Sequence, residues 1–483
     1  MAKNGSNSPS IYWHDYETFG INPKTDRPSQ FAGVRTDFDL NIIGEPLMIY
    51  AKPANDFLPE PDACLITGIT PQKTLSDGVP ESTFMQTILD EFSQPNTCVA
   101  GYNNLRFDDE FTRYSLYRNL FPAYDREWQN GNSRWDIIDL VRVTHALRPD
   151  GINWPTHEDG RPSYRLEQLT QANNLSHESA HDALSDVLAT IAIAKLIKQK
   201  QPALYDYYFK NRQKTNVIKL LDAANKKPVL HTSSMFSTVF YCTALVVPLI
   251  QHPTNTNAVV CYDLRYDPSS LLSLTAEEIR KRLYTKAEDL PEGEERIAIK
   301  SIHLNKCPVI VPAKIDDYVA QRLSIDKTSS HKHLELLRQS ADLEHKLVEV
   351  FSENDFADIT DPDQALYSGP FFSSRDKNLM QQIHRLDPAS LIGKQFDFSD
   401  SRLDEMLFRY RARNHPASLT EDEKKRWENY RQARLTDENN SWMTVLKFKN
   451  RIQALKQSNS ITPAQIAILG QLLEYGKNII IQP

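Results

Sequence analysis

Apolar and polar residues follow two different spacings over the first two hundred positions of the chain. Alternation with a period of two predicts strands, and apolar residues three and four positions apart predict amphipathic helices. The expected strands are 11–17, 29–36, 46–52 and 97–103, and the expected helices are 81–92, 106–119, 136–147, 165–173 and 183–198. Three strands come before the first helix and no glycine-rich loop is present, which argues against a doubly wound nucleotide-binding fold.

The pattern changes twice further along the chain. After a boundary at 199–202, β-branched residues predict strands at 238–247, 257–262, 297–304 and 309–311. From about 355 onward helices are expected at 374–386, 401–413, 420–435, 441–457 and 463–475. A chain of 483 residues is too long for one core. We therefore predict three domains, at 10–200, 201–355 and 356–483.

Composition narrows the class of protein. Charged residues make up 25% and apolar residues 40%, as in soluble globular proteins. No apolar run is long enough to cross a membrane and residues 1–10 are polar, so we expect a cytoplasmic protein without a signal peptide. Five widely spaced cysteines without a C-x-x-C pair predict buried free thiols. A net charge of −7 argues against indiscriminate coating of nucleic acid, although a local basic groove is compatible with it.

The first block of candidate chemistry is 14–20, which contains Asp15 and Glu17. Residues two apart on a strand point to the same side, so these carboxylates should lie next to each other. Two such charges repel unless a cation lies between them, and hard oxygen ligands suit Mg²⁺ or Mn²⁺. An isolated D-x-E is also common at exposed strand ends.

A second block at 103–108 and a third at 181–186 supply further acids and one histidine. Asp108 is expected in the first turn of a helix, where the helix dipole favours any acid, including its neighbours Asp109 and Glu110. Asp186 lies beside the apolar stripe of the helix at 183–198, and His181 precedes it by five residues, in a loop or first turn. Each residue taken alone also fits an ordinary surface position.

Arginine and aromatic residues are concentrated between the second and third blocks. Arginine pairs with phosphate oxygens and flat rings stack on unpaired bases, so the segment is typical of a nucleic-acid contact. Amphipathic helices with solvated arginines and buried rings explain part of the same pattern. The arginines are Arg106, Arg113, Arg118, Arg126, Arg134, Arg142, Arg148, Arg161 and Arg165.

The three blocks, in this order, resemble the signatures of the DEDDh 3′→5′ exonucleases: D-x-E, Asn-x-x-Phe-Asp and His-x-x-x-x-Asp. Over essentially its whole length the chain is similar to the bacterial exodeoxyribonuclease I family. The segments that carry this similarity are 14–20, 66–71, 101–104, 132–136, 147–149, 151–155, 303–308 and 408–414.

The resemblance implies an α/β protein with a ribonuclease H-like exonuclease domain, an SH3-like β barrel and an α-helical C-terminal domain. It implies removal of 5′-mononucleotides from the 3′ end of single-stranded DNA, in DNA repair and recombination. Asp15, Glu17 and Asp186 would bind two divalent ions, Mg²⁺ with Mn²⁺ as a substitute. Asp108, chosen over its neighbours on the resemblance alone, would support the second ion, and His181 would be the general base.

The resemblance also implies substrate and partner contacts. Glu17, Thr18 and Phe19 should lie against the terminal nucleotide, and Arg113, Arg142 and Arg165 should touch DNA. A closed channel around the strand would be lined by Lys226, Lys227, His303, Lys306, Arg409, Arg411 and Arg413. The acidic C-terminal tail of single-stranded DNA-binding protein would dock on Arg148, Tyr207 and Arg338, and we expect a monomer.

Two alternative functions stay open at this point. The acidic blocks do not distinguish the sugar, so an exonuclease that acts on RNA has the same core motifs. A non-catalytic protein that binds single strands could have kept the fold, although the intact acids argue against it.

Overall fold

The computed structural model describes residues 8–177, 182–352, 359–439, 442–458 and 461–481. The chain forms two compact units. The first contains Met1–Ser133, His177–Leu188 and Asp358–Pro483, and the second contains Arg134–Ser176 and Ala189–Ala357. These units group residues by dense contact, so the domain boundaries at 200 and 355 stay predictions. Each unit is described by itself.

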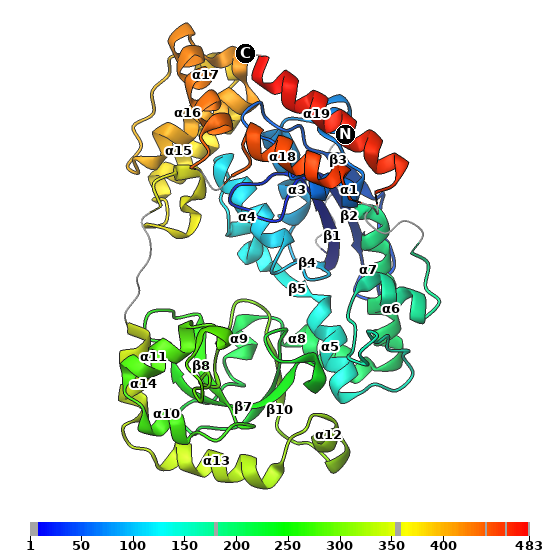
Figure 1. Cartoon of the computed structure of the whole chain (residues 1–483), viewed down its shortest axis with the longest axis vertical. Helices are drawn as coiled ribbons and strands as arrows, with labels where there is room; N and C mark the ends of the chain where they lie inside the picture. Colours follow the sequence, from blue (N-terminus) through cyan, green and yellow to red (C-terminus); the bar gives the residue numbers. More distant parts are fainter. Residues whose placement is uncertain (1–7, 178–181, 353–358, 440–441, 459–460, 482–483) are drawn as a thin grey trace. The chain divides into compact units, whose positions relative to one another are not determined.

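A mixed sheet lies at the centre of the first unit (Figure 1). Its strands are β1 (Ser10–Thr18), β2 (Pro28–Thr36), β3 (Leu47–Tyr50) and β4 (Thr97–Gly101), in the order β3-β2-β1-β4. Strand β1 is antiparallel to β2 and parallel to β4. The chain leaves the first unit at β5 (Ser133–Asp136), which follows β4 in the sheet order and was not predicted. The prediction of three strands before any helix is confirmed.

One side of the sheet packs against α3 (Glu81–Phe92) and α4 (Asp108–Arg118). Tyr12 and Tyr16 of β1 join Phe31 and Phe92 in this core. Side chains alternate between the two faces of a strand. Asp15 lies an odd number of positions from both tyrosines, so it faces the opposite side of the sheet. The core therefore fixes which side of β1 carries the carboxylates.

The C-terminal helices belong to the first unit and begin close to where the sequence places them. They are α15 (Ser374–Arg385), α16 (Arg402–Asn414), α17 (Glu421–Thr436), α18 (Val445–Lys456) and α19 (Pro463–Ile481). Helices α18 and α19 lie against α1 (Pro61–Thr67) and α2 (Pro71–Asp77), two short helices that were not predicted (Figure 1). Helices of seven residues are too short to establish a helical period in the sequence.

The second unit contains a sheet of five antiparallel strands in the order β10-β6-β7-β8-β9. The strands are β6 (Val229–Thr232), β7 (Thr243–Gln251), β8 (Ala258–Asp263), β9 (Ile299–His303) and β10 (Val309–Pro312). The strand predicted at 238–247 begins five residues too early. Tyr241 and Cys242 both have positive φ, which breaks extended backbone before β7. Strand β6 was missed altogether.

Helices cover part of this second sheet. The helices of the second unit are α5 (Ile137–Leu147), α6 (Leu166–Ala172), α8 (Pro202–Lys210), α9 (Lys214–Val217), α10 (Ser269–Ser273), α11 (Ala276–Tyr284), α12 (Asp317–Arg322), α13 (Lys327–Gln339) and α14 (Leu343–Ser352). Ile279, Leu337 and Leu347 pack with Val260 of β8 in one core. The prediction missed α8 to α14. The capping box at α11, in which Thr275 and Glu278 each accept from the other's backbone N–H, was a visible signal.

Two predictions from composition concern the whole chain. All five cysteines are free and buried, as expected. Among the described residues, no helix combines the length and the apolar content that a membrane crossing requires.

Candidate active site

Three carboxylates converge in the first unit. Asp15 and Glu17 come from β1, and Asp186 comes from the first turn of α7 (Ala183–Lys200). Each offers an oxygen that lies within 4.8 Å of the other two. Glu17 is buried and the other two are half-buried. A carboxylate cluster of this size has the oxygen ligands that Mg²⁺ or Mn²⁺ requires.

A fourth acid, Asp108, is held against the same strand. The backbone N–H of Tyr16 donates to Asp108 Oδ1 at 3.1 Å. Because Tyr16 lies between Asp15 and Glu17 in the chain, this bond places the Asp108 carboxylate next to both. The hydroxyl of Thr112, one turn further along α4, donates to the Tyr16 hydroxyl at 3.1 Å. This second bond joins α4 to the side of β1 opposite to Asp15 and Glu17.

The two acids next to Asp108 have other roles. Asp109 Oδ1 accepts from Arg126 Nη2 at 2.7 Å, and both side chains are fully buried. Glu110 forms an ion pair with Arg113 at 2.8 Å and accepts from the Tyr367 hydroxyl at 2.6 Å. The structure therefore separates three consecutive acids that the sequence pattern left equivalent: Asp108 accepts from the backbone of β1, Asp109 from Arg126, and Glu110 from Arg113 and Tyr367.

The acids of the cluster raise one another's pKa values. Burial, and then the neighbouring Asp108 and Glu17, raise the pKa of Asp15 well above its ordinary value. Burial, and then Asp186 and Asp108, raise the pKa of Glu17 to about 8. A bound divalent cation would remove this repulsion, so the electrostatics of the site fit a metal.

Metal binding should therefore depend on pH. Below about pH 8 a cation must displace the proton on Glu17, so we expect the apparent affinity for Mg²⁺ to rise by up to about tenfold per pH unit between pH 6 and 8. Calorimetric titration in buffers of different ionisation enthalpy measures both the affinity and the protons released. An affinity independent of pH, with no proton release, would contradict this electrostatic description.

The same shift in the pKa of Glu17 predicts how the stability of the metal-free protein depends on pH. At pH values between 4.5, the ordinary pKa of a glutamate, and about 8, Glu17 is protonated to a greater extent in the folded state than in the unfolded state. The free energy of unfolding should therefore fall as the pH rises through this window.

Asp186 also contacts a histidine that the sequence analysis did not single out. His177 Nε2 lies 2.5 Å from Asp186 Oδ1. Asp182 accepts from the backbone N–H of Ser185 at 3.3 Å and so stabilises the start of α7. A second histidine four residues before His181 was the available sequence signal. His181 itself lies outside the described residues.

The residues predicted to contact the terminal nucleotide, Glu17, Thr18 and Phe19, are all buried. The Thr18 hydroxyl donates to the backbone oxygen of Gly20 at 2.6 Å and is buried. The Phe19 side chain is 1% exposed and packs near Phe57, with ring centroids 6.1 Å apart. The Phe19 ring belongs to the core shared with α18 and α19, and the predicted contact of residues 18 and 19 with the terminal nucleotide stays a prediction.

The arginines predicted to touch DNA have different surroundings. Arg113 is buried, and its three nitrogens donate to Glu127, Glu110 and Tyr367, which favours a structural role over the predicted phosphate contact. Arg142 donates to Asp139 at 2.7 Å and is also buried. Arg165 is exposed just before α6. Arg142 and Arg165 belong to the second unit, so their contact with DNA stays a prediction.

Three of the predicted channel residues lie inside the protein. Arg409, Arg411 and Arg413 of α16 are buried, and the prediction that they line a channel is wrong for these three. Each forms ion pairs with acidic side chains of the first unit. Their acidic partners are Asp361, Asp363 and Glu405 for Arg409, Glu423 for Arg411, and Asp56 and Asp363 for Arg413. Channel contacts by Lys226, Lys227, His303 and Lys306 stay predictions.

The residues predicted to bind a partner all lie in the second unit. Arg148 and Arg338 are exposed. Tyr207 is half-buried, and its hydroxyl donates to the backbone oxygen of Ile310 at 3.0 Å. This partner site stays a prediction.

A central strand with two carboxylates, and two flanking helices that add one each, define a metal-dependent nuclease with a ribonuclease H-like fold. Comparison with known proteins agrees. The family described as Exonuclease matches residues 12–194, the Exonuclease I SH3-like domain matches 212–353, and the Exonuclease I C-terminal domain matches 360–479. The chain belongs to the exodeoxyribonuclease I family, and the predicted fold class is confirmed.

The similarity to individual relatives extends over the whole chain. It is 47% identical to exodeoxyribonuclease I of Haemophilus influenzae, over 98% of this chain and 99% of that protein. It is 42% identical to the Escherichia coli enzyme, over 99% and 100%. Among solved structures, Exonuclease I from Methylocaldum szegediense has a TM-score of 0.94 at 50% identity, covering 98% and 100% of the two chains. E. coli Exonuclease I in complex with a dA16 oligonucleotide has a TM-score of 0.94 at 43% identity, with the same coverage.

Proposed function

We propose that this protein removes 5′-mononucleotides from the 3′ end of single-stranded DNA by two-metal-ion hydrolysis. The observation that carries the proposal is the convergence of Asp15, Glu17 and Asp186, with Asp108 bound to the same strand. Structures of the E. coli relative with single-stranded oligonucleotides, and of its zinc-bound form with single-stranded DNA, support the substrate and the need for a metal.

Each residue of the site would have a separate role in this reaction. Divalent ions, Mg²⁺ in the first place and Mn²⁺ as a substitute, would neutralise phosphate charge and make water easier to ionise. Asp15, Glu17 and Asp186 would hold them, and Asp108 would support the second ion directly or through water. His181 would take the proton of the attacking water. The new bond joins the water oxygen to phosphorus, and the bond from phosphorus to the 3′ oxygen of the preceding nucleotide breaks.

Replacement of His181 by alanine tests the general base. We expect the chemical step to slow by about 10²–10⁴-fold near pH 7, because a positioned base is lost. Activity should recover in part at high pH, where hydroxide replaces the assisted water. The pH profile of single-turnover cleavage measures both effects. A rate and profile like those of the unmodified enzyme would remove His181 from the mechanism.

Digestion of 5′-labelled substrates tests the function as a whole. A single DNA strand, the matching blunt duplex and an RNA strand of the same sequence are compared with Mg²⁺ and with EDTA. We expect a ladder that shortens from the 3′ end, on single-stranded DNA and only with metal. Preference for RNA would favour the RNA exonuclease, and binding without cleavage under any divalent ion would favour the non-catalytic alternative.

The partner and setting are also part of the proposal. We infer a cytoplasmic monomer that acts in DNA repair and recombination and binds the acidic tail of single-stranded DNA-binding protein. The exposed guanidinium groups of Arg148 and Arg338 support such a contact, because an acidic peptide needs solvent-accessible cations. Arg148→Glu should weaken binding of the tail peptide by at least about tenfold in a fluorescence titration. Unchanged binding would place the tail elsewhere.

A further inference from the structure

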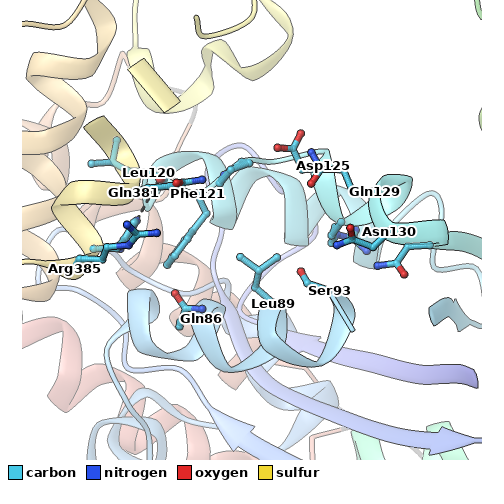
Figure 2. Close-up of a pocket in the computed structure, with 14 residues that line it drawn as sticks. Gln86, Leu89, Ser93, Leu120, Phe121, Asp125, Gln129, Asn130, Gln381 and Arg385 are labelled. Carbon is cyan, nitrogen blue, oxygen red and sulfur yellow. Dashed lines mark hydrogen bonds between the residues drawn. The ribbon is translucent and has the colours of Figure 1, made fainter. Parts of the chain in front are cut away.

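A cavity of about 360 Å³ opens in the first unit, between α3, the segment that follows α4, and α15 (Figure 2). None of the four clustered acids lines it. Its volume lies within the range of small-molecule sites, about 300–1,000 Å³. The cavity is therefore large enough for a ligand and is separate in its residues from the proposed active site.

The lining has polar ends and an apolar middle. Figure 2 shows Gln381 and Arg385 of α15 at one end and Gln129 and Asn130 at the other. Leu89 of α3 and Phe121 lie between them. An occupant of this cavity would meet hydrogen-bonding groups at both ends and flat or aliphatic carbon in the middle.

The Phe121 wall is held in place by aromatic stacking. The His384 ring stacks on Phe121 with centroids 3.9 Å apart and planes 9° apart. His384 Nε2 also lies 3.2 Å from the backbone oxygen of Leu120. Burial lowers the pKa of His384 to about 4, so this ring is neutral near pH 7. The wall therefore carries no charge of its own near pH 7.

The charges around the cavity do not cancel. Arg126, which lines the cavity, is buried and paired with Asp109. Asp125 lies 3.8 Å from the ammonium of Lys377. Within the part of the chain that the structure describes, the Arg385 guanidinium has neither an ion pair nor a hydrogen bond, and it is exposed. One uncompensated positive charge therefore remains, at the α15 end.

A nucleotide fits this arrangement. Its phosphate would lie next to Arg385, its flat ring over Leu89 and Phe121, and its base edge against the amides at the far end. Arginine binds phosphate oxygens through several donors, and asparagine and glutamine side chains offer both a donor and an acceptor to a base edge. We propose that this cavity is a second binding site, for a single deoxynucleoside 5′-monophosphate. The choice of nucleotide rests on the proposed function, because this is the class of product that the reaction would release.

Direct binding to the full-length protein in EDTA tests the site without any turnover. Without metal, the four acids should repel a phosphate, so binding at the active site is suppressed. The probes are dTMP, thymidine and inorganic phosphate, each titrated by calorimetry. Arg385→Glu reverses the charge at one end, and Leu89→Trp fills the middle. Arg375→Glu is the matched control, because Arg375 is exposed on the same helix and does not line the cavity.

We expect dTMP to bind with 1:1 stoichiometry, more tightly than either thymidine or phosphate. Arg385→Glu and Leu89→Trp should each weaken binding at least tenfold, and Arg375→Glu should leave it unchanged. Circular dichroism checks that the variants are folded; if Leu89→Trp is not, Arg385→Glu decides alone.

Three results would overturn the proposal: no dTMP binding up to about 10 mM, binding that both cavity variants leave unchanged, or phosphate binding as tight as that of dTMP. The last result would indicate a simple anion site. Since no cleavage is measured, failure of the exonuclease proposal would appear only in the digestion assay, and failure of the cavity only here.

Discussion

Asp186→Asn should reduce the rate of DNA hydrolysis by at least about a thousandfold, equivalent to about 4 kcal/mol of transition-state stabilisation. The substitution keeps the shape of the side chain and removes one of three charges whose oxygens lie within 4.8 Å of one another. Asp15→Asn should have the same effect, because it removes another charge from the same cluster. Binding of single-stranded DNA should be largely preserved, since neither variant removes a cationic side chain that could pair with phosphate. Single-turnover cleavage and fluorescence anisotropy measure the two properties separately.

Asp182→Asn is the matched control for this prediction. It removes an equal charge four residues earlier, but Asp182 is outside the convergent group and accepts from the Ser185 backbone and from Gln30 Nε2. We expect a rate within about tenfold of that of the unmodified enzyme, the size of one lost hydrogen bond. Equal losses for Asp182→Asn and Asp186→Asn would show that general negative charge matters and would refute the assignment of specific ligands.

The second large effect is on stability. Arg413→Ala should lower the free energy of unfolding of the first unit by about 3–5 kcal/mol, because removing one member of a buried ion pair leaves its partners charged and unsolvated. Arg413 Nη2 lies 2.9 Å from Asp56 Oδ2 and 2.8 Å from Asp363 Oδ2, and all three side chains are buried. Denaturant midpoints followed by circular dichroism give the change. DNA cleavage below the unfolding transition should be nearly unaffected.

The pH dependence of this effect has a definite sign. Burial alone would raise the pKa of Asp56, but Arg413 and Arg434 outweigh it and hold the pKa at about 2. In the unmodified protein this carboxylate therefore stabilises the fold above about pH 4, and the contribution is lost as the pH falls towards 2. In Arg413→Ala the pKa of Asp56 should rise. The loss of unfolding free energy relative to the unmodified protein should therefore be largest at neutral pH and smallest in acid.

Arg375→Ala is the comparison for the stability measurement. Arg375 lies on α15 and pairs with Asp397, but both side chains are exposed. Exposed pairs contribute about 0–1 kcal/mol, so the midpoint should hardly move. If Arg413→Ala were as mild as this control, Arg413 would be available for DNA, as the resemblance had implied.

Much of the fold near the site was predictable because it depends on local spacing. The period of two placed Asp15 and Glu17 on one side of β1, and the 3.6-residue period placed Asp186 in the first turn of α7. Short elements were not predictable in this way. Strand β6 has four residues and α1 has seven, so neither establishes a period, and tertiary packing stabilises them.

The sequence by itself determined the order of the acidic blocks, the faces of the long strands and helices, and the class of chemistry that carboxylates and a histidine can perform. These follow from backbone geometry, which acts between residues a few positions apart. Only the tertiary structure decided which of several similar residues does what. Asp108 differs from Asp109 because Tyr16 donates to one and Arg126 to the other. Arg413 is a core residue because Asp56, 357 positions away, lies beside it. Pairing of charges depends on proximity in space, and burial makes each such pairing costly to break.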